Sequence, residues 1–222
     1  MSAEQLQALC SGAFTACDIS DALLKLKVPH AGFLVDIDLK HAGSTRGFVA
    51  APATTVLFAL KASTEPPSIS GHFADNASAP GTIAVLSAPA GTRCAVLGGL
   101  VAARLAKRGV RGVVVGGRVR DLSEMELGDE WQVWAQGTST VGAGAETRCV
   151  GIDVDIEVAG VMVKAEDIVV MDQTAGGVVV IPKDKVAEVL ELMPKAVEAD
   201  MLVGEDVQAG MELGASMKSR RG

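Results

Sequence analysis

The residues best suited to chemistry in this chain are a glycine pair, Gly98-Gly99, and an arginine–aspartate pair, Arg120-Asp121. A guanidinium can bind a carboxylate through two parallel hydrogen bonds, and a carboxylate can bind a divalent cation. Glycines at the start of a helix leave backbone N–H groups open to an anion. These four residues could therefore hold a small anionic substrate and a metal ion, provided that the fold brings them together.

The segment between the two pairs predicts a helix followed by a strand. Residues 97–107 (LGGLVAARLAK) lack proline and are rich in helix formers, and Gly109 stands where a helix would end. Residues 110–115 (VRGVVV) have the short, β-branched character of a buried strand. A helix of about ten residues is roughly 15 Å long and a strand of about six is roughly 20 Å long. If the two pack antiparallel, Arg120-Asp121 returns to the helix start at Gly98-Gly99.

Hydrophobic patterning predicts further elements on both sides of this unit. Helices are expected at 3–9 and 15–26, and a C-terminal helical tail at 184–215, which Pro194 interrupts and which frays from Ser216. Residues 29–47 are expected to form a loop. Strands are expected at 82–87, 132–135, 152–158, 161–163, 168–171 and 177–181. Early helices, a central β-α-β unit and a run of strands indicate an α/β fold with a mixed sheet.

Composition limits the possible classes of protein. The chain of 222 residues has no linker, so residues 1–222 are expected to form one domain. The net charge is −7 and no basic run occurs, which argues against nucleic acid as a partner. No apolar run approaches membrane-spanning length, so no membrane partner is expected. The four cysteines show no paired spacing and are expected to be buried free thiols in the reducing cytoplasm.

The stretch 98–125 (GGLVAARLAKRGVRGVVVGGRVRDLSEM) resembles the signature of the RraA-like family. That signature is a glycine or an acidic residue, then twenty residues, then Arg-Asp; Gly99 precedes Arg120-Asp121 at this spacing. FTACDISDAL near the N-terminus, GTSTVGAG after the motif, and DIVVMD and GVVVIP later also resemble the family. The resemblance covers about residues 12–195.

This resemblance implies a swivelling β/β/α-type sandwich that forms homotrimers, some of them paired into hexamers, with sites between subunits. The family includes class II 4-hydroxy-4-methyl-2-oxoglutarate aldolases, which also decarboxylate oxaloacetate. In these enzymes the matching Arg binds the substrate carboxylate and the matching Asp binds Mg²⁺ or Mn²⁺. Carried over, Arg120 and Asp121 are catalytic, Asp121 is the metal ligand, and the backbone of Gly98, Gly99, Leu100 and Val101 contacts the pyruvoyl group. Gly99 differs from the acidic residue of the bacterial aldolases.

The implied activity is a metal-dependent lyase acting on a small α-keto acid. The carboxylate and carbonyl of such a substrate can chelate one metal ion, which stabilises the pyruvate enolate formed when the C–C bond breaks. An alternative is a non-catalytic regulator that resembles the protein inhibitors of ribonuclease E, since these also keep the Arg-Asp pair. Methyl transfer is disfavoured because no glycine-rich loop with a following acidic ribose ligand occurs.

Other polar residues have simpler interpretations. Asp153, Asp155 and Glu157 alternate with apolar residues, which favours a solvated strand face over a cation site. His72 with Asp75 could reach a neighbouring site, but ordinary surface roles are favoured. Without the family spacing, Arg120-Asp121 would itself be interpreted as a surface ion pair with Asp121 capping the next helix.

Overall fold

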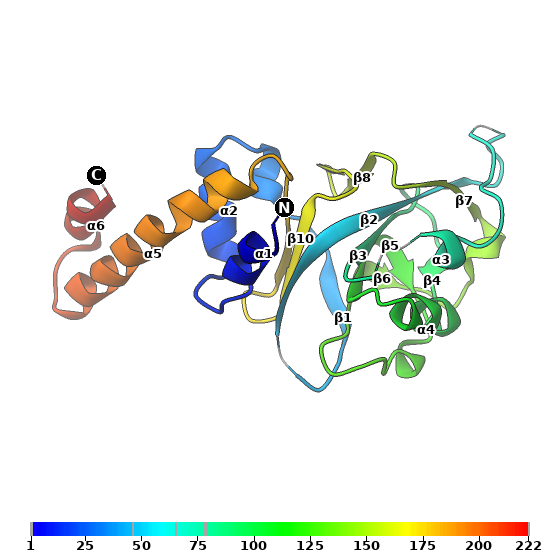
Figure 1. Ribbon diagram of the computed structural model, residues 1–222, viewed down its shortest axis with the longest axis horizontal. Coiled ribbons are helices and arrows are strands. Elements are labelled where there is room, and N and C mark those ends of the chain that lie inside the picture. Colours follow the sequence, from blue (N-terminus) through cyan, green and yellow to red (C-terminus); the bar gives the residue numbers. More distant parts are fainter. Residues whose placement is uncertain (1, 46, 65, 78–79, 222) are drawn as a thin grey trace.

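A curled mixed sheet forms the centre of the computed structural model, which describes residues 2–45, 47–64, 66–77 and 80–221 (Figure 1). Its main path runs β1-β6-β5-β3-β2-β10-β11, with β4 paired to β5 and β7 paired to β2. The pairings among β6, β5, β3, β2 and β4 are parallel, and the others are antiparallel. The strands of this sheet are β1 (Asp38–Ala42), β2 (Phe48–Leu60), β3 (Ile83–Ser87), β4 (Ala95–Leu97), β5 (Gly112–Val119), β6 (Gln132–Thr138), β7 (Thr147–Ile152), β10 (Ile168–Asp172) and β11 (Gly177–Ile181).

The helices divide between two sides of the sheet (Figure 1). On one side, α1 (Ala3–Leu9), α2 (Ala16–Lys25) and the long α5 (Val186–Gln208) bury apolar residues against β10 and β11, and α6 (Leu213–Arg221) folds back on α5. On the other side, α3 (Phe73–Asn76) and α4 (Gly99–Lys107) cover β3 and β5. A third cluster is enclosed between the curled sheet and the hairpin of β8 (Ile156–Val158) and β9 (Val161–Val163).

The α/β class and the mixed sheet are confirmed, as is the swivelling β/β/α-type arrangement. The predicted helix at 3–9 has the bounds of α1, and the strand at 177–181 has those of β11. Thr15 begins α2 with a capping box, in which its side chain accepts from the N–H of Asp18 while the Asp18 carboxylate accepts from the N–H of Thr15. None of the described helices combines the length and the hydrophobicity needed to span a bilayer.

Four expectations about secondary structure are wrong. The alternating run 152–158 is not one strand, because Asp153 adopts a left-handed backbone (φ 53°) between β7 and β8 and its carboxylate accepts a hydrogen bond from Thr54. Pro194 does not end a helix, since buried residues on both sides hold α5 in one piece. The segment 29–47 is not all loop, because β1 pairs with β6. Leu97 lies in β4 rather than in a helix.

The C-terminal tail and the cysteines also differ from expectation. The tail does not fray at Ser216, which is fully buried; α6 continues to Arg221, and Arg220 makes two hydrogen bonds to Asp206 (2.9 and 3.0 Å). All four cysteines are free, but Cys10 and Cys17 are exposed rather than buried. The irregular sequence of residues 65–80 is compatible with a lid or a subunit contact, and residues 65 and 78–79 of this stretch lie outside the described residues.

Candidate functional site

The two residue pairs singled out in the sequence meet at one corner of the sheet. Strand β4 runs parallel to β5, with Leu97 opposite Val119, and α4 begins directly after it with Gly98 as its N-cap. The N–H of Arg120 donates to the carbonyl of Leu97 at 3.0 Å, which joins the end of β5 to the start of the helix. Arg120-Asp121 therefore returns to the helix start at Gly98-Gly99, as expected. The pairing of β4 with β5, rather than packing of the helix on the strand alone, brings the two pairs together.

Gly98 lies against both charged side chains of this corner. A Cβ atom at this position would lie 3.0 Å from Oδ2 of Asp121 and 3.2 Å from Nε of Arg120. Both distances are shorter than ordinary van der Waals contacts, so a side chain at 98 would displace the charged groups. Those groups are themselves 3.2 Å apart, and their side chains are 41% and 39% exposed, which leaves both open to a ligand.

Asp121 holds an unusual backbone conformation. Its φ is +58°, in the left-handed region that an Asp tolerates better than most residues. It occupies the N-cap position of the 3₁₀ helix η2 (Leu122–Glu124), yet its side chain makes no capping hydrogen bond. The ion pair with Arg120 that the simpler interpretation expects is present at 3.2 Å, but the side-chain cap is not, and the carboxylate lies against Gly98 instead.

Glu124 is a member of this corner that the sequence interpretation missed. A Cβ atom at Gly99 would lie 2.6 Å from Cβ of Glu124, so this side chain packs over the glycine and fills the space of an acidic residue at 99. Glu124 is the last residue of η2 and follows Asp121 by three residues. The three-residue spacing after Arg-Asp is the signal that could have identified it.

The start of α4 supplies backbone donors. Gly98 has no side chain to cap the helix, and the first intrahelical bond runs from the N–H of Ala102 to the carbonyl of Gly98. The N–H groups of Gly99, Leu100 and Val101 precede it and carry the partial positive charge of a helix N-terminus. Leu100 is 85% exposed, so this end of the helix faces solvent.

The loop after β6 borders the Arg120 guanidinium. A Cβ atom at Gly142 would lie 3.2 Å from Nη1 of Arg120, so the absence of a side chain at Gly142 leaves space for the guanidinium.

His72 and Asp75 make contacts with residues close to them in the fold. Nδ1 of His72 accepts a hydrogen bond from the N–H of Ala74, and Asp75 forms an ion pair with Arg104 at 2.7 Å. The structure does not bring either residue to the corner as a ligand.

The donor set suits a hard divalent cation. Within the described residues no group of three or more His, Cys, Asp or Glu side chains is arranged to hold a metal. The corner offers two carboxylates, Asp121 and Glu124, at a solvent-facing helix start. Mg²⁺ is typically held by one or two carboxylates, with waters and substrate oxygens completing its octahedron. The residues present therefore fit this ion.

The model of the RraA-like family, described as Aldolase/RraA, matches residues 16–180 of this chain. The chain belongs to the RraA-like family. A relative from Halalkalibacterium halodurans, named "Putative 4-hydroxy-4-methyl-2-oxoglutarate aldolase", is 32% identical over 116 residues, which cover 52% of this chain and 53% of that protein. The chain thus spans about half the length of the curated relatives it matches.

Two solved structures have a fold similar to that of this chain. An uncharacterised protein from Pseudomonas syringae pv. tomato has a TM-score of 0.80 at 21% identity, covering 99% of this chain and 95% of its own. RraAS2 from Streptomyces coelicolor, described as an unusual member of the RNase ES inhibitor RraA protein family, has a TM-score of 0.73 at 24% identity. It covers 86% of this chain and 91% of its own.

Proposed function

We propose that this RraA-like protein is a divalent-metal-dependent lyase that cleaves a C–C bond of a small α-keto acid. Its reactions would be aldol cleavage of 4-hydroxy-4-methyl-2-oxoglutarate or a relative, decarboxylation of oxaloacetate, or both. The observation that carries the proposal is the meeting of Arg120, Asp121 and Glu124 at the open N-terminus of α4. The family match and the name of the bacterial relative support it.

Each group has a role that follows from its chemistry. Arg120 binds the substrate carboxylate through a charge-assisted, bidentate pair, and the N–H groups of Gly99, Leu100 and Val101 donate to the same end of the substrate. Asp121 would be the metal ligand, and Glu124, which packs over Gly99, would hold the metal or its water shell. A bound Mg²⁺ or Mn²⁺ would supply the Lewis acid for the negative charge that develops on the keto oxygen.

The two reactions share one electron movement. In the aldol reaction the C4 hydroxyl loses its proton, the C3–C4 bond breaks and a carbonyl forms at C4. In the decarboxylation the bond to the departing carboxylate breaks and CO₂ leaves. Both leave the electron pair on the pyruvate enolate, which takes a proton at C3 to give pyruvate. The positive charges beside Gly98 stabilise that anion more than the neutral keto group, which is the requirement for catalysis.

The test is pyruvate production from oxaloacetate with Mg²⁺, with and without EDTA, after subtraction of the metal-only decay. Asp121→Asn is the decisive variant, because Asn also tolerates the left-handed backbone and only the charge changes. We expect chelator-sensitive turnover that falls at least about a hundredfold in this variant, since the carboxylate that binds the metal loses its charge. Asp155→Asn, at an exposed carboxylate 3.8 Å from Lys164, is the matched control.

The other outcome points to the regulatory alternative. RraAS2 is described as belonging to a family of RNase ES inhibitors, so a ribonuclease is the partner to test. Absence of lyase turnover on both substrates, together with a stable ribonuclease complex in a pull-down, would replace the lyase assignment. Full Mg²⁺-dependent activity in Asp121→Asn would reject only the role of Asp121 as the metal ligand.

We also expect this protein to form a homotrimer. Light scattering that gives a monomer at micromolar concentration would contradict this expectation.

A further inference from the structure

A second group of cationic side chains lies beside the corner, and the proposed function does not use it. It lines a hollow of about 280 Å³ formed by three pieces of chain: the loop after β3, the end of β5 and Gln136 of β6. Arg93 comes from the loop and Arg118 from β5. The remaining lining residues are Pro89, Ala90, Gly91, Thr92 and Gly117.

The charge of this hollow is unbalanced. No carboxylate is among its lining residues, although acidic residues outnumber basic ones in the chain, 27 to 20. Within the described part of the chain, the Arg93 guanidinium makes no hydrogen bond or ion pair, and that of Arg118 makes one, from Nη1 to the carbonyl of Thr138 at 3.1 Å. A guanidinium carries five N–H donors, so most of them remain available to a ligand.

The fold positions the Arg118 side chain and the backbone of Arg93. The pairing of β5 with β6 is irregular between Val115 and Arg118, and such bulges redirect side chains. Arg118 then lies over Gly137, where a Cβ atom would be 2.7 Å from its Nη1. The loop is fixed by Glu146, whose Oε2 accepts from the backbone N–H of Arg93 at 2.7 Å. Such preorganisation lowers the entropic cost of binding.

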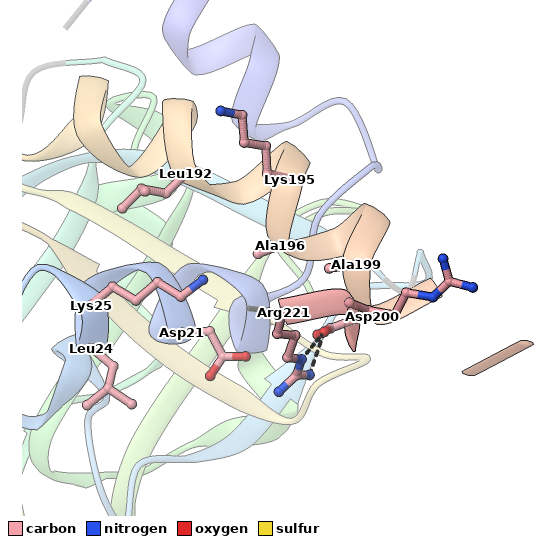
Figure 2. A pocket seen from close by; sticks show the side chains of 10 residues that line it. Asp21, Leu24, Lys25, Leu192, Lys195, Ala196, Ala199, Asp200 and Arg221 are labelled. Carbon is pink, nitrogen blue, oxygen red and sulfur yellow. Dashed lines mark hydrogen bonds and ion pairs between the residues drawn. The ribbon is translucent and has the colours of Figure 1, made fainter. Parts of the chain in front are cut away.

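The larger hollow between α2, α5 and α6 provides the contrast (Figure 2). It has a volume of about 480 Å³ and also contains arginines. There, however, Arg221 pairs with Asp200, Arg220 pairs with Asp206, and Asp21 adds a further carboxylate to the lining. Both of its arginines are compensated by carboxylates, whereas the two arginines of the Arg93–Arg118 hollow are not; Lys25 and Lys195 also line the larger hollow.

We propose that the Arg93–Arg118 hollow is a binding site for an oxyanion group, a carboxylate or a phosphate. Two guanidinium groups with free donors, and no competing carboxylate, match the planar and charged oxygens of such a group. Two sources of the group are compatible with this chemistry. Arg118 precedes Arg120 by two residues, so the group can be the distal carboxylate of a dicarboxylic α-keto acid held at the corner; in this case the inference rests on the proposed function. The other source is a separate small anion.

The test measures binding directly and does not depend on catalysis. Inorganic phosphate and succinate are titrated by calorimetry at low salt into the full chain carrying Arg120→Gln, which removes the carboxylate clamp of the corner. Arg118→Gln and Arg93→Gln are then added singly, and Arg221→Gln is the matched control because it removes the same charge far from the hollow. We expect each hollow variant to weaken anion binding by at least about tenfold, as for a lost charge-assisted hydrogen bond, and the control to leave it unchanged.

Kinetics in the otherwise unmodified chain then separate the two sources. A rise of KM in Arg118→Gln for 4-hydroxy-4-methyl-2-oxoglutarate, whose distal carboxylate is retained during aldol cleavage, but not for an α-keto acid without a distal carboxylate, assigns the group to the substrate. An unchanged KM with lost phosphate binding assigns it to a separate anion. Failure of both probes to bind, or equal binding in the hollow variants and the control, would overturn the site even if the lyase activity is confirmed. Loss of lyase activity with intact phosphate binding would instead remove only the proposed function.

Discussion

Replacement of Gly98 by alanine tests the geometry of the corner with one added methyl group. The new Cβ would lie 3.0 Å from Oδ2 of Asp121 and 3.2 Å from Nε of Arg120, so both groups must retreat by a few tenths of an ångström. The backbone itself accepts the change, because Gly98 has a φ of −134°. The substitution therefore acts on the positions of the two charges and not on the chain conformation.

The magnitude follows from how steeply catalysis depends on position. A misplacement of about 1 Å can cost a hundredfold in rate, so a shift of several tenths should lower kcat/KM by about tenfold, or ~1.4 kcal/mol. The free energy of unfolding should fall by about 1 kcal/mol, since Gly is preferred over Ala at an N-cap. Pyruvate formation and thermal unfolding measure the two effects separately.

The control is Gly144→Ala, because nothing lies within 4 Å of a Cβ at that glycine. It should leave both kcat/KM and the unfolding temperature close to wild type. A wild-type kcat/KM in Gly98→Ala would refute the reasoning. Activity would then not depend on the observed positions of the Asp121 carboxylate and the Arg120 guanidinium. A loss of activity explained by global unfolding would equally fail to support it, which is why the thermal measurement accompanies the assay.

Three further predictions concern other parts of the molecule. Gly204→Ala, in the interior of α5 and with open space around the added Cβ, should stabilise the protein by about 0.5–1 kcal/mol in denaturant unfolding. Hydrogen bonds from Arg220 and Ser216, together with the charge of Arg220, lower the pKa of Asp206 to about 2 from its ordinary 3.8. The stabilisation of α6 by this carboxylate should therefore be complete above about pH 4 and be lost as the pH falls through about 2, which hydrogen exchange in α6 can follow. Glu124→Gln should weaken Mg²⁺ binding in calorimetry while leaving the unfolding temperature unchanged, because Glu124 is exposed.

Local sequence determined much of the corner. Residues 97–115 combine a run of helix formers, a stop glycine and a β-branched run, and these signals were sufficient to predict that Arg120-Asp121 returns to Gly98. Strand β4 was not predicted because three residues carry too little periodicity, and because Leu97 continues directly into a helical pattern. Its pairing with β5 is a long-range contact that no local rule provides.

Tertiary contacts explain the remaining differences. Proline ordinarily ends a helix, but Val189 and Met193 before Pro194 and Val203 after it are buried, and this packing outweighs one lost hydrogen bond. The tail is polar and rich in Lys and Arg, as disordered ends are, yet the carboxylates of Asp200 and Asp206 hold it against α5. The sequence does not indicate Glu124, because its partner, Gly99, is distant in sequence and has no side chain to suggest a contact.

The length of β2 has a consequence for how the protein unfolds. Its first residues, Phe48 to Pro52, pair with β10; residues 53–57 pair with β3; and residues 56–60 pair with β7. Pro52 falls where the strand passes from one partner to the next. One continuous strand thus belongs to the cores on both sides of the sheet, and a register slip of one residue would turn its side chains to the wrong core at once. The cores on the two sides of the sheet should consequently unfold in a single cooperative transition. The backbone amides of β2 should be among the last to exchange with solvent.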